Sequence, residues 1–344
     1  MKILKISDTH FTWEPKHKYR LKLIEQIEQV LKAHEQSGDP IDEIWLLGDL
    51  ADHKDNHGAL LVNFLIEGFF RWLEYVHRIR IIRGNHDGIG ETGFWKFTNL
   101  YDNIAYYDDI YETNIDGHDY LFLPHTRNPD ETWSKVVVKD KVCIVHATVR
   151  NSVTESGFKL TEADLEAEYF AESLITFSGD IHQPQTVGKV IYVGSPYNTR
   201  FGDKFDGGYI IFDTKTLKWE RHLLDFPRLR MVDVSDIKSL EKELATFKKG
   251  DHVKVRIHLS HEQDNLNEWK EIQTQATNKI VANFALENLE IIETKGVIKP
   301  LAVDQNQGPQ QVSDFEAFCE LNKINDRLKN VGIKLMQQRQ LQEK

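Results

Sequence analysis

The sequence predicts an α/β protein in which one large unit is followed by a small α+β unit and by helices at the C-terminal end. Three observations predict this class. Segments with the patterns of strands and helices alternate from residue 1 to about residue 224. Several strands are short runs rich in Val and Ile, as in strands covered on both faces. After Pro227 the pattern changes to strand, helix, strand, helix, strand.

The strands of the large unit, which we place at residues 1–226, are separated by polar turns. They are expected at residues 2–7, 43–47, 78–82, 110–115, 120–123, 141–145, 174–178, 190–193, 208–212 and 218–224. Asp116 and Gly117 form the pair typical of a tight hairpin turn, so the fourth and fifth of these strands should be antiparallel neighbours.

Two helices in this unit have different apolar patterns. The helix expected at residues 16–34 places Leu23, Ile27 and Leu31 on one stripe, which predicts an amphipathic helix. The segment from Asn56 to His77 is apolar on nearly all sides. Such a helix is either deeply buried or shared with a partner, and the pattern alone leaves both readings open.

The rest of the chain divides into a small unit at residues 227–299, a linker at 300–312 and a helical segment at 313–344. Elements of the small unit are expected at residues 231–234, 237–247, 252–259, 265–284 and 289–293. The linker is rich in Gln, Pro and Gly. In the helical segment Ser313 and Glu316 form a capping box, and Phe315, Phe318, Leu321 and Ile324 form an apolar stripe. This stripe either docks on a partner or packs on its own unit.

Composition limits the classes of function. The net charge of −11 argues against nucleic-acid binding without help, because phosphate contacts usually leave a basic footprint. No apolar run approaches the ~20 residues of a membrane span. The residues after Met1 have the pattern of a strand rather than a signal peptide, and Cys143 and Cys319 fit reduced thiols. We therefore expect a cytoplasmic protein.

Five of the expected strands end in the same chemistry. The residues that follow them are Asp8 and His10; Asp49; Asn85, His86 and Asp87; His146; and Asp180 and His182. The carboxyl ends of strands in an open α/β sheet form the ligand crevice, so these residues should meet there. Any one of these motifs is weak evidence, but together they predict a metal centre.

The residue types indicate which metals would bind. Thiolates are missing from the set, which argues against a structural zinc site. Carboxylate, amide and imidazole ligands suit manganese, iron or zinc. There are more ligands than one ion needs, so we expect two ions bridged by one carboxylate. Two ions ~3.5–4 Å apart can activate a water and stabilise phosphoryl oxygens, which predicts phosphoester hydrolysis.

In their order along the chain these motifs resemble those of the calcineurin-like metallophosphoesterases, namely D-x-H, G-D, G-N-H-D, a lone His and G-H-x-H. The resemblance implies a β-sandwich flanked by helices. It also implies two metal ions that share Asp49. The first ion would be held by Asp8, His10, Asp49 and His182, and the second by Asp49, Asn85, His146 and the residue at position 180.

The same resemblance implies roles for two residues that follow Asn85. His86 would face the scissile phosphate and protonate or stabilise the leaving oxygen as a general acid. Asp87 would either orient His86 or cap a turn. Asp180 departs from the family pattern, which has a histidine there. A carboxylate is harder than imidazole, so we expect Asp180 to ligate and to favour manganese or magnesium over softer ions.

A closer resemblance is to SbcD-type nucleases, the nuclease subunits of SbcC–SbcD-like complexes in double-strand-break repair and recombination. It rests on the segment from Gly194 to Asp203 and on the layout after Pro227. It implies a DNA exonuclease and endonuclease with a DNA-facing capping domain at residues 227–299. It also implies an SbcC-like coiled-coil ATPase bound to the C-terminal helices, and a homodimer formed through the helix from Asn56 to His77.

Two other functions stay open at this point. The same metal site would serve a stand-alone enzyme that hydrolyses a small phosphoester, and Asp180 could mark a non-catalytic scaffold. Three further residues are candidates for substrate binding: Arg83, Arg200 and His125, although for His125 a structural role is the stronger reading. The loop residue His53 has no expected role. As in compact bacterial and viral members, the expected location is the cytoplasm of a bacterium or of a virus-infected host cell.

Overall fold

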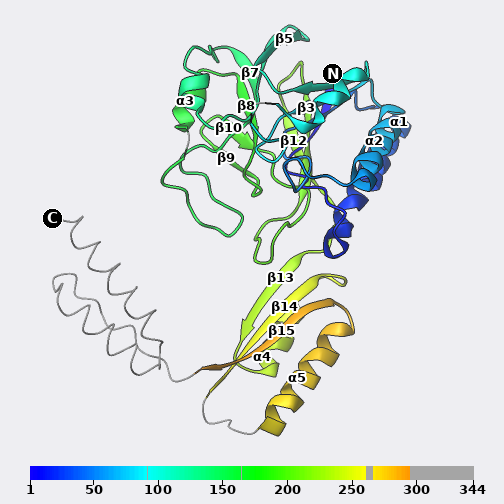
Figure 1. Cartoon of the computed structure of the whole chain (residues 1–344), viewed down its shortest axis with the longest axis vertical. Helices are drawn as coiled ribbons and strands as arrows, with labels where there is room; N and C mark the ends of the chain where they lie inside the picture. The colour runs from blue at the N-terminus through cyan, green and yellow to red at the C-terminus, as the bar shows by residue number, and fades with distance from the viewer. Residues whose placement is uncertain (91, 164, 261–265, 295–344) are drawn as a thin grey trace, which may run out of the picture. The chain divides into compact units, whose positions relative to one another are not determined.

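The computed structural model describes residues 1–90, 92–163, 165–260 and 266–294 (Figure 1). The expected linker and C-terminal helices lie outside these residues, as does Cys319. Within the described part of the chain, no helix is long and apolar enough to cross a membrane.

Two six-stranded sheets form the large unit, which confirms the predicted α/β class. The first sheet has the order β12-β11-β1-β2-β3-β4, and the second β5-β6-β7-β8-β10-β9. The strands of the first sheet are β1 (Lys2–Ile6), β2 (Glu43–Leu46), β3 (Arg78–Ile82), β4 (Ile104–Tyr107), β11 (Gly208–Asp213) and β12 (Trp219–Leu223). Those of the second are β5 (Tyr111–Ile115), β6 (His118–Leu123), β7 (Lys141–His146), β8 (Ile175–Gly179), β9 (Gln185–Val187) and β10 (Val190–Tyr192).

The directions of the strands place the candidate metal ligands at one edge of the two sheets. Strands β1 to β4 are parallel to one another, and so are β6, β7, β8 and β10. Apolar side chains from both sheets share one buried cluster, which includes Ile3, Trp45, Phe122, Phe177 and Phe212. The sheets therefore form a sandwich, and the carboxyl ends of their parallel strands present the loops that follow them.

A charged side chain lies inside this sandwich. Lys5 of β1 is fully buried, and its Nζ lies 3.6 Å from the centroid of the Trp45 ring. The same Nζ has no hydrogen-bond partner among the described residues. Burial holds the pKa of Lys5 well below its usual range, because the charged form is poorly solvated there.

Replacing Lys5 by methionine should therefore stabilise the protein. The substitution keeps the length of the side chain and removes an amine that is buried without a partner. We expect the Tm to rise by about 2–6 °C, as for a gain of about 1–2 kcal/mol in a chain of this size. Differential scanning fluorimetry would measure it, with Lys2→Met at the partly exposed Lys2 as a control that shifts Tm by less than about 1 °C. A lower Tm for Lys5→Met would show that the aromatic rings stabilise a charged amine.

Helices α1 (Leu23–Gln36) and α2 (Ala59–Leu73) share a second buried cluster with the first sheet. The expected helix at residues 16–34 is divided, because residues Pro15–Lys22 form a 3-10 helix before α1 begins. In α2 one face is buried, whereas Leu60 and Phe70 on the same helix are 64% and 46% exposed. Burial therefore accounts for only part of its apolar surface. The shorter helices are α3 (Pro129–Thr132) and the 3-10 turns Phe94–Leu100 and Ala167–Phe170.

The small unit has the order of elements that the sequence predicts. Its sheet has the order β13-β14-β15. The elements are β13 (Leu229–Val234), α4 (Ile237–Leu244), β14 (His252–Ser260), α5 (Leu266–Val281) and β15 (Ala285–Thr294). Asp236 caps α4, since its Oδ1 accepts a hydrogen bond from the backbone N–H of Ser239 at 2.7 Å. Val232, Val255 and Leu240 belong to the core of this unit.

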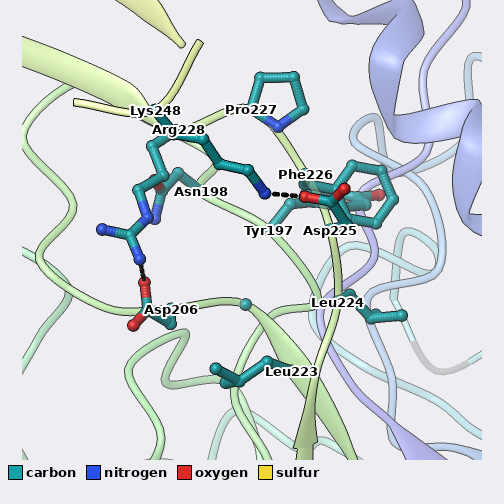
Figure 2. Close-up of a pocket in the computed structure, with 11 residues that line it drawn as sticks. Tyr197, Asn198, Asp206, Leu223, Leu224, Asp225, Phe226, Pro227, Arg228 and Lys248 are labelled. Atoms are coloured by element: carbon teal, nitrogen blue, oxygen red, sulfur yellow. Dashed lines mark hydrogen bonds and ion pairs between the residues drawn. The ribbon is translucent and has the colours of Figure 1, made fainter. Parts of the chain in front are cut away.

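The chain enters the small unit beside a cavity of about 310 Å³ around Pro227, which Figure 2 shows in close-up. Two ion pairs flank it, Arg228 with Asp206 and Lys248 with Asp225. The side chains of both pairs are well exposed, so each pair contributes no more than about 1 kcal/mol. A hydrogen bond of 3.3 Å from the backbone N–H of Leu229, at the start of β13, to Asn198 Oδ1 also joins the small unit to the large one.

Candidate metal centre

The loops that follow five strands meet at one edge of the sandwich, as predicted. His146 is the last residue of β7, and Asp180 comes directly after β8. Four of the converging residues have left-handed backbones, with φ of 53° at Asp8, 41° at His10, 54° at Asp49 and 82° at Asp180. Such conformations are disfavoured for side chains larger than glycine and cluster at functional sites.

Glycines allow these loops to come close. A Cβ atom on Gly48, where φ is +88°, would lie 2.2 Å from His146 Nδ1. A Cβ atom on Gly84 would lie 2.2 Å from Asp49 Oδ1. Any side chain at either position would displace a residue of the centre, so space requires both glycines, and the left-handed backbone of Gly48 favours glycine there as well.

The first group of converging atoms surrounds His10. Its Nε2 lies 3.0 Å from Nε2 of His182 and 3.6 Å from Oδ2 of Asp49. Burial lowers the pKa of His182 to about 4 and that of His10 well below its usual range, so both imidazoles are neutral at pH 7. His182 Nδ1 hydrogen-bonds Thr199 Oγ1 at 2.9 Å, so Nε2 is the ring nitrogen that faces His10. Asp8 adds a buried Oδ2 with no hydrogen-bond partner among the described residues.

A second group of converging atoms surrounds His146. Its Nδ1 donates to the carbonyl of Leu47 at 2.7 Å, so its Nε2 carries a lone pair. This Nε2 lies 3.1 Å from the side-chain amide of Asn85 and 3.4 Å from Asp49 Oδ1. The NH2 group of that amide can donate to His146 Nε2 at 3.1 Å and to the two carboxylate oxygens of Asp49 at 2.9 and 3.0 Å. Imidazole, carboxylate and amide groups thus meet here, and these are the residue types expected for a metal site.

The electrostatics of both groups fit divalent ions. Burial raises the pKa of Asp8 to about 7 and that of Asp49 well above its usual range. Side by side in a buried site, such carboxylates are costly unless positive charge accompanies them. The oxygens of Asp49 face different groups, Oδ2 toward His10 and Oδ1 toward His146. The donor set therefore fits two ions, with Asp49 in the bridging position.

His86 lies at the mouth of this centre and lines the same cleft. Its Nδ1 hydrogen-bonds the carbonyl of Asp52 at 2.7 Å, and its backbone N–H donates to Asp49 Oδ1 at 2.8 Å. Because Nδ1 is engaged by a carbonyl, Nε2 is the atom left to act in the cleft. This arrangement suits the general-acid role expected for His86.

The comparison with known families supports the same chemistry. The family model described as calcineurin-like phosphoesterase matches residues 1–184, which is more than half of the chain. The chain belongs to the calcineurin-like phosphoesterase family. Members of this family bind two divalent metals, in agreement with the two groups around Asp49.

Individual relatives are distant. A protein of Acanthamoeba polyphaga mimivirus, described as uncharacterized protein R555, is 22% identical over 330 residues, which cover 87% of this chain and 21% of that protein. The chain thus spans about one fifth of that relative's length. Among solved structures, a novel archaeal phosphodiesterase is 15% identical, with coverage of 65% of this chain and 100% of that one and a TM-score of 0.33. The purple acid phosphatase PPD1 of yellow lupin (Lupinus luteus) is 14% identical, with coverage of 65% and 52% and a TM-score of 0.36.

Asp180 is the position at which this phosphoesterase departs from the family motif. Its Oδ1 lies 3.8 Å from His146 Nε2, and Thr148 donates a hydrogen bond to its Oδ2. Its backbone N–H donates to Asp8 Oδ1 at 3.0 Å. Oδ1 of Asp180 therefore faces the group around His146, while Oδ2 is held by Thr148. Ligation by Asp180 stays a prediction.

Replacing Asp180 by alanine should weaken one of two metal-binding events by at least about tenfold and leave the other unchanged. The second group would lose a nearby carboxylate, whereas the atoms around His10 and His182 would be untouched. Isothermal titration calorimetry with manganese would resolve the two events. Thr148→Val is the matched control, because it removes the hydroxyl that holds Asp180 but keeps the carboxylate, and it should have the smaller effect. Two unchanged affinities in Asp180→Ala would rule out ligation.

Asp87 takes the second of the two roles considered for it. Its side chain is fully buried and accepts three backbone hydrogen bonds, from Gly84 and Asp49 to Oδ2 and from Leu50 to Oδ1, at 2.7, 2.8 and 2.8 Å. His86 is oriented by the carbonyl of Asp52 instead. The assignment of Asp87 as a catalytic residue is therefore corrected. It is a positioning residue that ties the loop of Asp49 to the loop of Asn85.

One residue of the centre was missed from the sequence. Arg20 is 3% exposed and lines the metal cleft. Its Nη1 donates to the carbonyl of His10 at 2.8 Å and lies 3.3 Å from Asp52 Oδ1, and its Nη2 donates to the carbonyl of Thr199 at 3.1 Å. Arg20 therefore connects the segments that orient the first metal group and His86. The amphipathic pattern at residues 16–34 assigned it no role, because two of its partners are backbone carbonyls.

The three expected substrate-binding residues are divided between two cavities. Arg200 lines the metal cleft, where its well-exposed side chain lies 3.5 Å from Glu155. Arg83 and His125 line a neighbouring cavity, and Arg83 Nη2 donates to the carbonyl of His125 at 2.6 Å. His53 is exposed beside Glu14, as expected for a loop histidine.

Proposed function

We propose that this phosphoesterase is a two-metal phosphodiesterase that cleaves DNA, as the nuclease subunit of an SbcC–SbcD-like repair complex. The observation that carries phosphodiester hydrolysis is the position of Asp49 between two groups of candidate metal ligands, with His86 at the mouth of the same cleft. When bound, two divalent ions supply an activated water and neutralise charge on the phosphoryl oxygens. Manganese is the ion we expect.

The residues of the chain divide the remaining work. Asp49 joins the two metal groups, and Asp87 holds the backbone beside it. The carbonyl of Asp52 accepts a hydrogen bond from Nδ1 of His86 and so fixes the ring with Nε2 toward the cleft. In its doubly protonated imidazolium form, His86 can give the Nε2 proton to the leaving oxygen. Arg20 and Thr199 keep His10 and His182 facing each other.

Support for DNA as substrate comes from the segment that resembles SbcD-type nucleases. Ser195 Oγ donates to the carbonyl of Asp8 at 3.0 Å, and Tyr197 donates to the carbonyl of Thr9. Asp203 accepts from the backbone N–H groups of Thr199 and Arg200 at 2.8 and 3.0 Å. The segment thus braces the loop of the first metal group. On β14, Lys254 and Arg256 alternate with the buried Val253, Val255 and Ile257, which gives one face of this strand positive charge.

Cleavage of DNA in the presence of manganese tests this proposal. We expect nicked or shortened DNA with manganese, and none after chelation with EDTA. A small chromogenic phosphodiester serves as the second substrate. Its turnover without any cleavage of DNA, alone or with an SbcC-like ATPase, would favour the stand-alone enzyme and refute the nuclease. The ATPase would bind the C-terminal helices, so a chain ending at residue 300 should lose co-purification with it.

The exposed apolar residues of α2 support a homodimer. Leu60 and Phe70 are exposed on α2, and the ring of Phe70 lies 5.3 Å from that of Tyr101, next to the 84% exposed Leu100. Replacing both Leu60 and Phe70 by Asp should convert a dimer into a monomer in size-exclusion chromatography with light scattering, because an apolar contact cannot bury charge. Leu223→Asp, at another exposed apolar residue, is the control. A double variant that stays dimeric would place the interface elsewhere.

A further inference from the structure

A second cavity, of about 640 Å³, adjoins the metal cleft. Asn85 lines both, so the cavity begins where the second metal group ends. Its walls come from the loop after β3, which includes Gly88 and Gly90, and from the segment between His125 and Thr132 after β6. The volume is that of a site for a small organic ligand.

The charge of this cavity is opposite to that of the whole chain. Among its described lining residues, Lys54, Arg83 and Arg127 are cationic and only Glu131 is acidic. Lys54 and Arg127 are exposed, and neither forms an ion pair within the described part of the chain. In a protein with a net charge of −11, such a local excess of positive charge favours an anionic ligand.

Neutral polar groups complete the cavity. The ring centroid of His125 lies 6.1 Å from that of His146, so the cavity reaches close to a metal group. Thr126 and Thr132 have hydroxyl oxygens 3.0 Å apart. A Cβ atom built on Gly90 meets no atom within 4 Å, so this part of the wall is open. Imidazole and hydroxyl groups can bond a sugar or the edge of a base.

The excess of positive charge ends beyond this cavity. A further cavity of about 460 Å³ shares Arg83, His125 and Thr126 with it and is also lined by Asp108 and Asp109. Asp109 is exposed, and Asp108 lies 3.0 Å from Lys96. Its described lining holds one cationic residue, Arg83, against two acidic ones, so it attracts a phosphate less than the cavity beside Asn85 does.

We propose that the cavity beside Asn85 binds the single nucleotide next to the scissile phosphodiester, with Lys54 and Arg127 attracting the phosphate on its far side. This inference rests on the proposed function and extends it, because it names a nucleoside monophosphate unit as the ligand. A DNA strand that enters the cavity has room for one nucleotide before it reaches Asp108 and Asp109. The enzyme should therefore release mainly mononucleotides from a strand end.

Direct binding tests the inference without metal chemistry. Metal-free protein in EDTA is titrated with dAMP, with adenosine and with inorganic phosphate, and binding is followed by calorimetry. We expect dAMP to bind at least tenfold more tightly than either of the other two, because only dAMP uses both the basic and the polar walls. Lys54→Glu combined with Arg127→Glu should weaken dAMP binding at least tenfold, and the Lys54→Gln, Arg127→Gln pair should lie between. Lys32→Glu, on the exposed side of α1, should leave binding unchanged.

Equal binding of dAMP and phosphate, or equal affinities in wild type and the charge-reversed variant, would overturn the nucleotide site. The products of DNA cleavage provide a second test, since mainly oligonucleotide products would also overturn it.

The nuclease proposal and the nucleotide-site proposal can fail separately. If DNA is cleaved but dAMP binding ignores Lys54 and Arg127, the cavity inference fails and the nuclease stands. If dAMP binds as expected but DNA is not cleaved, the nuclease fails instead.

Discussion

His86→Ala should lower phosphodiester turnover by at least about a hundredfold while two divalent ions still bind. General acid catalysis typically contributes ~10²–10⁴-fold, and Nε2 of His86 is the imidazole nitrogen left to act at the mouth of the cleft. The loss should be smaller for a substrate whose leaving group is a stable phenolate, because such a group needs no proton. Turnover of DNA and of a nitrophenyl phosphodiester, measured side by side, would show the difference.

Metal stoichiometry decides whether this explanation is right. A ring nitrogen of His86 lies near enough to His10 and Asp49 to form a ligand group with them. If His86→Ala binds only one ion, His86 is a ligand and the general-acid role is wrong. His53→Ala, at an exposed histidine of the neighbouring loop, should retain full turnover and both ions.

The second large effect is expected at Asp49. Asp49→Asn should reduce turnover to background and weaken both metal-binding events, because one carboxylate faces both metal groups. The metal-free Asp49→Asn variant should nevertheless be more stable than metal-free wild type. Burial raises the pKa of Asp49, so the ionised carboxylate is destabilising until positive charge arrives.

Thermal unfolding would measure both halves of this prediction. Manganese at 100 times its Kd stabilises the wild type by about 2.7 kcal/mol per site, which is a rise of several degrees in Tm. The Asp49→Asn variant should gain little from manganese. The conservative exchange Asp52→Asn, which keeps the carbonyl bonded to His86, is the control and should retain the manganese effect. An equal rise in Tm for Asp49→Asn and wild type would contradict the bridging position.

The sequence predicts that the candidate metal ligands converge because their loops follow strands. A parallel strand brings the residue after it to the sheet edge, so Asp8, Asn85 and Asp180 could be grouped without knowing any loop. The short strands β4 (Ile104–Tyr107) and β9 (Gln185–Val187) were not predicted. Neither has a clear apolar alternation against its polar neighbours, and pairing with adjacent strands decides its conformation.

Roles that depend on backbone partners were harder to predict. Arg20 joins three segments through carbonyls and a carboxylate, and no spacing in the sequence connects residue 20 with residue 199. The 3-10 helix Pro15–Lys22 carries this arginine, where a continuous α-helix was expected. Asp87 shows the same limitation, since three backbone N–H groups from two loops converge on it.

The crowding around Gly48 and Gly84 limits how this enzyme can evolve. Substitutions at these glycines would push His146 or Asp49 out of place, so the loops themselves offer no gradual route to a new metal preference. Space is less restricted at position 180, whose side chain is partly exposed and accepts a hydrogen bond from Thr148. Substitutions at Asp180 and Thr148 are therefore the ones by which natural selection or engineering could change the metal preference without displacing the crowded loops.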